Sequence, residues 1–217
     1  MPLKAVLFDF DGVLADTENF HIAAWQRTLA QIGIEPNDTL CLPAAETDDR
    51  KFLAEILAAR GIHDADIAGW VARKQDLTRS LLADNPRLYP GVFELVNALA
   101  GKVRMAVVSG SWRENIQAVL TSAKLADAFE VIVAKEDFPT SKPDPEPYLL
   151  ALSRLNVLPN EAVAIEDSAS GVASAVGAGI RTIAVGHRHA SGEWCANAEF
   201  VSDLASRHRE LDWILGV

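Results

Sequence analysis

Two aspartates at the end of a short apolar run are the first candidates for chemistry in this sequence. Residues 5–8 are apolar, and Asp9, Asp11 and Gly12 follow directly. A buried run that ends in two acids indicates a nearby cation, because a buried carboxylate needs a partner. Alternation along an extended chain would place both carboxylates on the same side. We therefore expect a metal-assisted phosphoryl-transfer site, with a plain strand-to-turn junction as the simpler alternative.

Polar residues also stand at three later points of the chain, two directly after apolar runs and one just before a predicted helix. They are Ser109, Gly110, Ser111, Lys142, Glu166 and Asp167. In an open α/β sheet the carboxyl ends of the strands border one crevice, so these groups would meet there. Each group alone also fits helix capping or a solvated loop. Their joint occurrence favours one shared site.

These residue types suit the transfer of a phosphoryl group. Asp9 can attack phosphorus, and Asp11 can protonate the leaving oxygen and later activate the acceptor. Because nucleophile and substrate are both negative, the reaction needs Mg²⁺ held by carboxylates and an ammonium such as that of Lys142. Ser109 and Gly110 offer hydrogen-bond donors to the phosphoryl oxygens.

Strand and helix patterns alternate over most of the chain and would position these residues. Strands are predicted at residues 5–8, 103–108, 131–134, 162–165 and 181–185, with a weaker one at 200–201. Helices are predicted at 113–122, 145–155, 171–177 and 203–215. This alternation predicts a doubly wound, Rossmann-like parallel sheet with helices on both faces.

Residues 17–85 interrupt this alternation with a helical periodicity. Apolar residues three or four positions apart predict three helices, which carry Ile22, Trp25, Leu29 and Ile32; Phe52, Leu53, Ile56 and Leu57; and Ile67, Trp70, Val71, Leu77 and Leu81. We therefore expect an α/β core domain of residues 1–16 and 86–217, and a small all-helical cap domain of residues 17–85. The cap would form a lid over the carboxyl ends of the strands.

The composition argues against several classes of partner. The chain has 217 residues and a net charge of −10, whereas nucleic acids and anionic membranes bind basic faces. We see no signal peptide and no apolar stretch near the roughly 18 residues of a membrane span. Cys41 and Cys195 fit free thiols in a reducing compartment. We predict a cytoplasmic monomer or small homo-oligomer that binds a small phosphorylated metabolite, not nucleic acid or membrane.

The motifs resemble those of the haloacid dehalogenase superfamily, and within it the β-phosphoglucomutase-like phosphatases and mutases with a helical cap. The resemblance rests on Asp-Phe-Asp-Gly-Val at residues 9–13, Ser109, Lys-Pro-Asp-Pro at 142–145, and Glu-Asp-Ser at 166–168 with Gly171. It implies that Asp9 is the nucleophile, Asp11 the acid–base, and Ser109 and Lys142 phosphate partners. It further implies Mg²⁺ held by Asp9, the Asp11 backbone carbonyl and Asp167, with Glu166 as an additional ligand.

The resemblance also implies that the cap selects the substrate. The pair Arg73–Lys74 resembles a basic pair that faces the site in relatives. His21 lies in a segment that resembles the entry to the cap and could reach the crevice, while Trp25 is expected to pack inside the cap. A solvated helix face is the alternative for the basic pair. With Gly110 and Ser111 of the core, the candidate substrate-binding residues are therefore His21, Arg50 and Lys74.

One departure from the family concerns a second phosphate. Sugar mutases of this group carry an arginine before the second cap helix that binds the phosphate that is not transferred. Alignment places Glu46 at the glycine of that segment and Asp49 at the arginine, with Arg50 one position on. A carboxylate would repel a phosphate, and Arg50 could replace the arginine only with a different loop register.

We therefore predict a Mg²⁺-dependent phosphatase that hydrolyses a small phosphorylated metabolite, a sugar phosphate, through an aspartyl-phosphate intermediate. A β-phosphoglucomutase-type sugar phosphomutase is the alternative, since it uses the same core residues and passes the phosphoryl group to a sugar hydroxyl. A signalling receiver domain also forms an aspartyl-phosphate. It would be shorter, however, and would carry its accepting aspartate on a later central strand, where this chain has Ser109.

Overall fold

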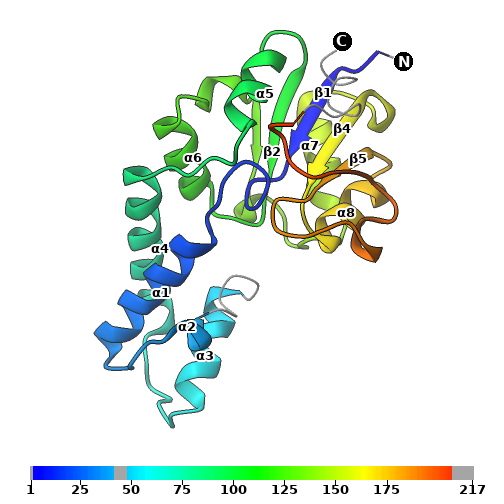
Figure 1. Cartoon of the computed structure of the whole chain (residues 1–217). Coiled ribbons are helices and arrows are strands. Elements are labelled where there is room, and N and C mark those ends of the chain that lie inside the picture. Colours follow the sequence, from blue (N-terminus) through cyan, green and yellow to red (C-terminus); the bar gives the residue numbers. More distant parts are fainter. Residues whose placement is uncertain (1, 42–47, 207–217) are drawn as a thin grey trace. The chain divides into compact units, whose positions relative to one another are not determined.

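The computed structural model describes residues 2–41 and 48–206. The chain divides into two compact units, which we call the core unit (Met1–Asp16 with Pro86–Val217) and the helical insert (Thr17–Asn85). Figure 1 shows the strands gathered in the core unit and helices α1 to α4 in the insert.

A six-stranded parallel sheet forms the centre of the core unit, in the order β3-β2-β1-β4-β5-β6. All four residues of β1 are buried, as expected for an apolar strand in the middle of a parallel sheet. The strands are β1 (Ala5–Phe8), β2 (Arg104–Val108), β3 (Val131–Val133), β4 (Ala162–Glu166), β5 (Arg181–Val185) and β6 (Glu199–Val201).

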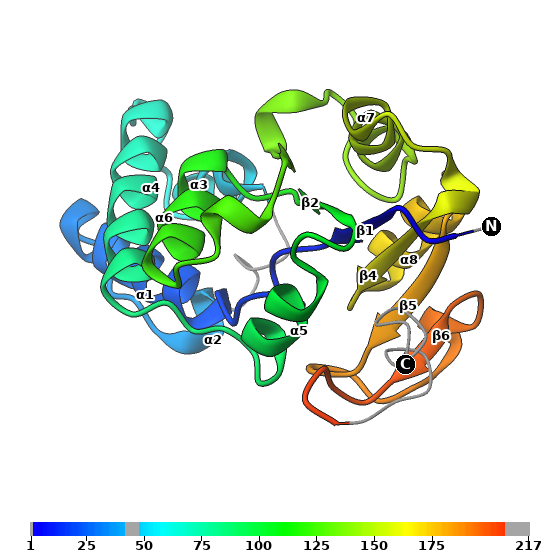
Figure 2. The same cartoon turned by 90° about the horizontal axis from the view of Figure 1, so that it is seen from above.

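Helices cover both faces of this sheet. Figure 2 shows α5 (Val92–Leu99) and α6 (Arg113–Ser122) on one face, and α7 (Glu146–Leu155) and α8 (Ala169–Gly177) on the other. Helix α7 buries Tyr148, Ala151, Leu152 and Leu155 against the strands, which follows helical spacing. The described part of the unit also contains short 3-10 turns: η2 (Ala126–Ala128), η3 (Lys135–Asp137), η4 (Pro159–Glu161) and η5 (Glu193–Cys195). The predicted Rossmann-like fold is confirmed.

Two helix predictions for the core unit need correction. Helix α5 was not predicted, although its apolar residues Val92, Leu95, Val96 and Leu99 have helical spacing and are buried. Residues 203–206, where the last predicted helix would begin, are not helical, and the Asp203 carboxylate there accepts the N–H groups of Ala205 and Ser206. Residues 207–217 lie outside the described part of the chain.

The described part of the helical insert contains α1 (Glu18–Ile32), α2 (Asp38–Cys41), α3 (Asp49–Ala58) and α4 (Ile67–Asp84). Gly33 ends α1 with a φ of 84°, a conformation that glycine adopts without strain. The insert has its own apolar core, in which the rings of Trp25 and Phe52 lie 4.8 Å apart. Trp25 is fully buried there, so it packs within the insert as expected.

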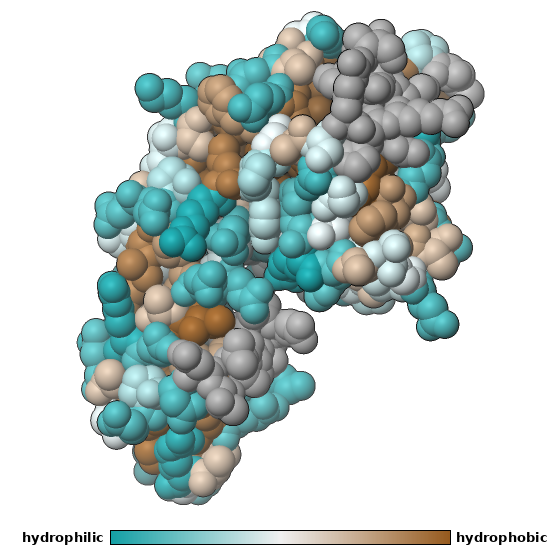
Figure 3. Space-filling model, viewed as in Figure 1, coloured by the Kyte–Doolittle hydropathy of each residue, from teal (hydrophilic) through white to brown (hydrophobic). Residues whose placement is uncertain are grey.

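The surface gives no sign of a large apolar patch on the face shown. In Figure 3 the hydrophobic areas of this face are broken up by hydrophilic residues. Large exposed apolar side chains in the described part of the chain are scattered over several elements: Ile62, Phe93, Leu149 and Leu158. Among the described residues, we find no helix with the length and apolar character that crossing a bilayer requires.

Candidate active site

The core unit brings the predicted acids to one edge of its sheet. Asp9 follows β1, and its N–H donates to the carbonyl of Ile165 at 2.9 Å, so the parallel pairing with β4 extends to this residue. Glu166 ends β4 and Asp167 follows it. All three acids are at least nine-tenths buried. Their position therefore follows from where the buried strands end.

The ammonium group of Lys142 is the central cation of this edge. Its Nζ lies 2.6 Å from Oδ1 of Asp9, 2.5 Å from Oε1 of Glu166 and 2.9 Å from the carbonyl oxygen of Val108. Burial disfavours the charged amine, but Asp9 and Glu166 outweigh it and raise the pKa of Lys142 above its usual value. Lys142 is therefore protonated at neutral pH.

The carboxylates at this edge carry more negative charge than Lys142 alone offsets. Burial raises the pKa of Asp9 well above its ordinary value, and Glu166, Asp167 and Asp11 act in the same direction against Lys142. Burial also raises the pKa of Asp167 to about 7, although Arg188 and Lys142 oppose that shift. A further cation at this edge would favour the ionised forms of Asp9 and Asp167.

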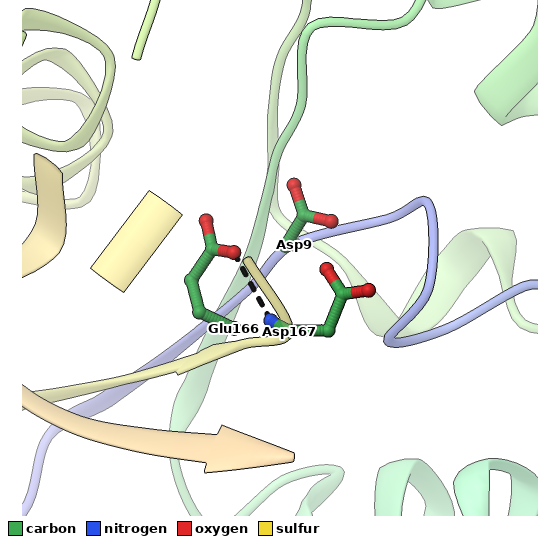
Figure 4. Close-up of side chains that lie close together, drawn as sticks. All are labelled: Asp9, Glu166 and Asp167. Carbon is green, nitrogen blue, oxygen red and sulfur yellow. Dashed lines mark hydrogen bonds between the residues drawn. The ribbon is translucent and has the colours of Figure 1, made fainter. Parts of the chain in front are cut away.

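Three of these acids fit a divalent cation. Asp9, Glu166 and Asp167 each offer a carboxylate oxygen, and these oxygens lie within 4.8 Å of one another. Figure 4 shows the three side chains around one small region. Oδ2 of Asp167 is buried and pairs with Nε of Arg188 at 2.9 Å, without an aligned hydrogen bond from the described residues. Hard oxygen donors of this kind suit Mg²⁺, so the donor set agrees with a magnesium site.

Two glycines leave room for these carboxylates. A Cβ atom at Gly12 would lie 1.9 Å from Oδ2 of Asp167, and one at Gly171 would lie 2.0 Å from Oε2 of Glu166. Both distances are far below a normal contact, so a side chain at either position would displace a candidate metal ligand. The residues Gly12 and Gly171 therefore belong to the site, although neither carries a functional group.

Asp11 is oriented by two serine hydroxyls from the loop after β2. Ser111 Oγ lies 2.6 Å and Ser109 Oγ 3.1 Å from Oδ2 of Asp11, and the N–H of Ser111 donates to Ser109 Oγ. Gly110 lies between them and is exposed. The roles of Ser109 and Gly110 at the phosphoryl oxygens, and of Ser111 in substrate binding, stay predictions. What the structure adds is that both hydroxyls contact the predicted acid–base.

Three side chains of this site were missed by sequence analysis. The Tyr148 hydroxyl donates to Oε1 of Glu166 at 2.8 Å, and burial raises its pKa. Arg188 Nε lies 2.9 Å from Oδ2 of Asp167. His187 Nδ1 lies 3.1 Å from the Gly12 carbonyl oxygen, and burial lowers the pKa of this imidazole. Arg188 and His187 could have been found from their position just after a predicted strand. Tyr148 could have been found from its position on the buried face of α7.

In the helical insert, Lys74 is buried in a polar cluster of its own. Its side chain is 0% exposed, and Nζ lies 2.9 Å from Oδ1 of Asp49 and 2.9 Å from Nδ1 of His21. Asp49 also accepts a hydrogen bond from the Trp25 indole at 3.1 Å and one from the Gln75 amide. Lys74 and His21 are therefore brought together around a carboxylate.

The other residues of the predicted phosphate-binding segment differ in exposure. Asp49 is the first residue of α3 and is buried, whereas Arg50 is exposed and its N–H donates to the Asp48 side chain. Glu46 lies outside the described residues. The roles of His21, Arg50 and Lys74 in substrate binding stay predictions.

Comparisons with known proteins agree with this site. Residues 6–185 match the haloacid dehalogenase-like hydrolase family. The chain is 34% identical to Protein CbbY of Rhodobacter capsulatus, over 95% of this chain and 96% of that protein. It is 32% identical to a phosphorylated carbohydrates phosphatase of Thermotoga maritima, over 83% and 84% of the two chains.

A solved structure is similar over nearly the whole length. The crystal structure of a putative β-phosphoglucomutase from Thermotoga maritima has a TM-score of 0.81 with this chain. The two are 29% identical in sequence, and 99% of each chain is covered. Family match, relatives and fold agree with the motifs quoted from the sequence. This chain is a β-phosphoglucomutase-like member of the haloacid dehalogenase-like hydrolase family.

Proposed function

We propose that this protein is a Mg²⁺-dependent phosphatase that hydrolyses a small phosphorylated metabolite, a sugar phosphate, through an aspartyl-phosphate intermediate. The observation that carries the proposal is the contact of Lys142 with Asp9 beside two further buried carboxylates. This combination supplies a nucleophile, a fixed positive charge and oxygen ligands at one sheet edge. The phosphatase named among the relatives supports the same reaction class.

The residues that would hold Mg²⁺ are Asp9, Glu166 and Asp167, together with the backbone carbonyl of Asp11. A bound Mg²⁺ supplies Lewis-acid neutralisation of the phosphoryl charge. Lys142 adds a fixed positive charge from the protein itself. It binds a phosphoryl oxygen and reduces the repulsion between the Asp9 carboxylate and the substrate.

The reaction divides into two displacements at phosphorus. In the first, a carboxylate oxygen of Asp9 forms a bond to phosphorus while the bond to the ester oxygen breaks, and Asp11 gives that oxygen its proton. In the second, Asp11 takes a proton from water as the water oxygen attacks phosphorus and the Asp9–phosphorus bond breaks. The hydrogen bonds from Ser109 and Ser111 orient Asp11 for both proton transfers.

The mutase alternative differs in the group that receives the phosphoryl group. It needs a cation for the second phosphate of a sugar bisphosphate, and this chain has Asp49 where such mutases carry their arginine. Asp49 is buried and paired with Lys74, so its carboxylate offsets the charge of that ammonium. This pairing favours hydrolysis of a monoester.

A panel of phosphorylated metabolites tests the proposal directly. Phosphate release is measured with and without Mg²⁺, and β-glucose 1-phosphate with a trace of the 1,6-bisphosphate is one member of the panel. Mg²⁺-dependent phosphate release from a sugar phosphate is the expected result. Accumulation of glucose 6-phosphate without free phosphate would instead establish the mutase.

We also propose a cytoplasmic location. Cys41 and Cys195 are both buried and lie outside disulfides in the described part of the chain. Thiols of this kind suit a reducing compartment. A sugar phosphate as substrate agrees with the same compartment.

A further inference from the structure

The loop after β5 is fixed against the first loop of the active site. Gly186 donates its N–H to the carbonyl of Val201 at 2.8 Å, which ties the start of the loop to β6. The next residue, His187, has its Nδ1 3.1 Å from the carbonyl oxygen of Gly12. A carbonyl oxygen only accepts, so Nδ1 is the donor. The loop after β5 is thus joined to the segment that follows β1.

A stacked ring fixes the same loop from another side. The imidazole of His187 lies nearly parallel to the ring of Tyr89, with centroids 4.1 Å apart and an interplanar angle of 16°. The carbonyl of Gly12 and the ring of Tyr89 together define where His187 lies. The backbone of the next residue, Arg188, is placed as a consequence.

From this loop, Arg188 reaches one oxygen of Asp167. Nε lies 2.9 Å from Oδ2, and the Arg188 side chain is 31% exposed while that of Asp167 is 2% exposed. Oδ2 has no aligned hydrogen bond in the described part of the chain, so the contact is an ion pair. Gly12 also borders this oxygen, because an added Cβ there would come within 1.9 Å of Oδ2. Oδ2 is therefore close to both Gly12 and Arg188.

The two carboxylate oxygens of Asp167 point in different directions. Figure 4 shows that the Asp167 carboxylate directs one oxygen toward Asp9 and the other away from it. We propose that Arg188 is a positioning residue of the metal site, which holds Oδ2 and thereby presents the second oxygen of Asp167 to the divalent cation. This inference rests on the proposed function, because it assigns a role relative to the Mg²⁺ of that site.

The direction in which Mg²⁺ affinity changes when Arg188 is removed distinguishes a positioning role from a purely electrostatic one. Residues that orient a metal ligand change metal affinity by about 10–100-fold when they are removed. The positive charge of Arg188 alone would act in the opposite direction, because one cation repels another. Removing a positioning arginine therefore weakens Mg²⁺ binding, whereas removing a competing cation strengthens it.

Calorimetric titration with Mg²⁺ alone, on the full chain without substrate, tests this inference. We expect Arg188→Met to raise the Kd for Mg²⁺ by about 10–100-fold, and to reduce the rise in Tm that Mg²⁺ causes. Arg188→Lys keeps a charge that can pair with Oδ2, so it should lose less affinity than Arg188→Met. The matched control is Arg181→Met, which removes the same charge at the start of β5, where Arg181 pairs with Glu199; its Kd should be unchanged.

Each outcome decides between the claims. An unchanged or lower Kd in Arg188→Met would overturn the role of Arg188 and leave the proposed function intact. Absence of Mg²⁺ binding by the unsubstituted protein would overturn the metal site itself, and this is seen without any variant. Far-UV circular dichroism of the metal-free variants establishes folding. If Arg188→Met does not fold, Arg188→Gln is tested instead. A raised Kd for Mg²⁺ is then expected, and an unchanged Kd would contradict the role of Arg188.

Discussion

Replacing Asp49 by Asn should destabilise the helical insert strongly, because it leaves the ammonium of Lys74 buried and without its counter-charge. Lys74 is 0% exposed and lies 2.9 Å from Oδ1 and 3.2 Å from Oδ2 of Asp49. At 2.9 Å, the attraction is on the order of 6 kcal/mol for an effective dielectric constant of about 20. Desolvation of both groups offsets much of it. The expected loss of unfolding free energy is about 3–5 kcal/mol, as for other broken buried pairs.

The reciprocal variant should cost less. In Lys74→Met, Asp49 keeps its hydrogen bond from the Trp25 indole, and its side chain is 12% exposed. We expect a loss of about 2 kcal/mol, the order of a hydrogen bond to a charged group. The double variant removes both charges and should lie closer to the unsubstituted protein than Asp49→Asn does. The coupling free energy between the two sites should be about 2–3 kcal/mol.

Urea unfolding followed by far-UV circular dichroism and tryptophan fluorescence measures these differences, and coincidence of the two probes checks for a single transition. Hydrogen exchange in α3 and α4 assigns the loss to the insert. The surface pair Lys51–Glu55 on α3 is the control: its atoms are 3.9 Å apart and both side chains are largely exposed, so Lys51→Met should change stability by less than about 1 kcal/mol. Additive effects of Asp49→Asn and Lys74→Met would refute the reasoning.

Two other substitutions test the core unit. Lys142→Met should lower kcat by about 10²–10³-fold in a steady-state phosphatase assay, because the fixed charge on the phosphoryl oxygen is lost; a loss below about tenfold would contradict the role of Lys142. Asp137 joins the N–H of Ala134 to Arg154 and Arg113. Burial raises its pKa, but the hydrogen bonds from Arg154 and Ala134 and the charge of Arg113 lower it below its ordinary value. The stability that Asp137 contributes is therefore present above about pH 4 and is lost as the pH falls through the lowered pKa. Asp137→Asn should destabilise the protein by about 1–3 kcal/mol at pH 7 and by less at pH 3 in urea unfolding, and an equal loss at both pH values would be the contrary result.

The fold could be predicted because its strands are uninterrupted apolar runs. Strand β1 lies at the predicted residues 5–8, and the sheet places the acids that follow β1 and β4 side by side. Helix α5 lies in a stretch for which no element was predicted, although its buried residues Val92, Leu95, Val96 and Leu99 have helical spacing. The short helix α2 has too few residues for a periodicity to be recognised.

The parts of the site that escaped prediction depend on tertiary contacts. Arg188 and Asp167 meet because the loop after β5 folds back to Gly12, and no local pattern records that contact. Lys74 lies on the buried stripe of α4 with Val71, Thr78 and Leu82, and its role in substrate binding stays a prediction. That helical spacing was the available signal. Its partner Asp49 could not be found from α4 alone.

The identity of the nucleophile is the central claim, and a trapping measurement tests it most directly. The protein is mixed with a phosphate-labelled sugar phosphate that it hydrolyses, quenched in acid, and digested for peptide mapping. The label should appear on Asp9 in the unsubstituted protein, and Asp9→Asn should show neither label nor Mg²⁺-dependent phosphate release. Label on another residue, or full phosphate release by Asp9→Asn, would contradict the account.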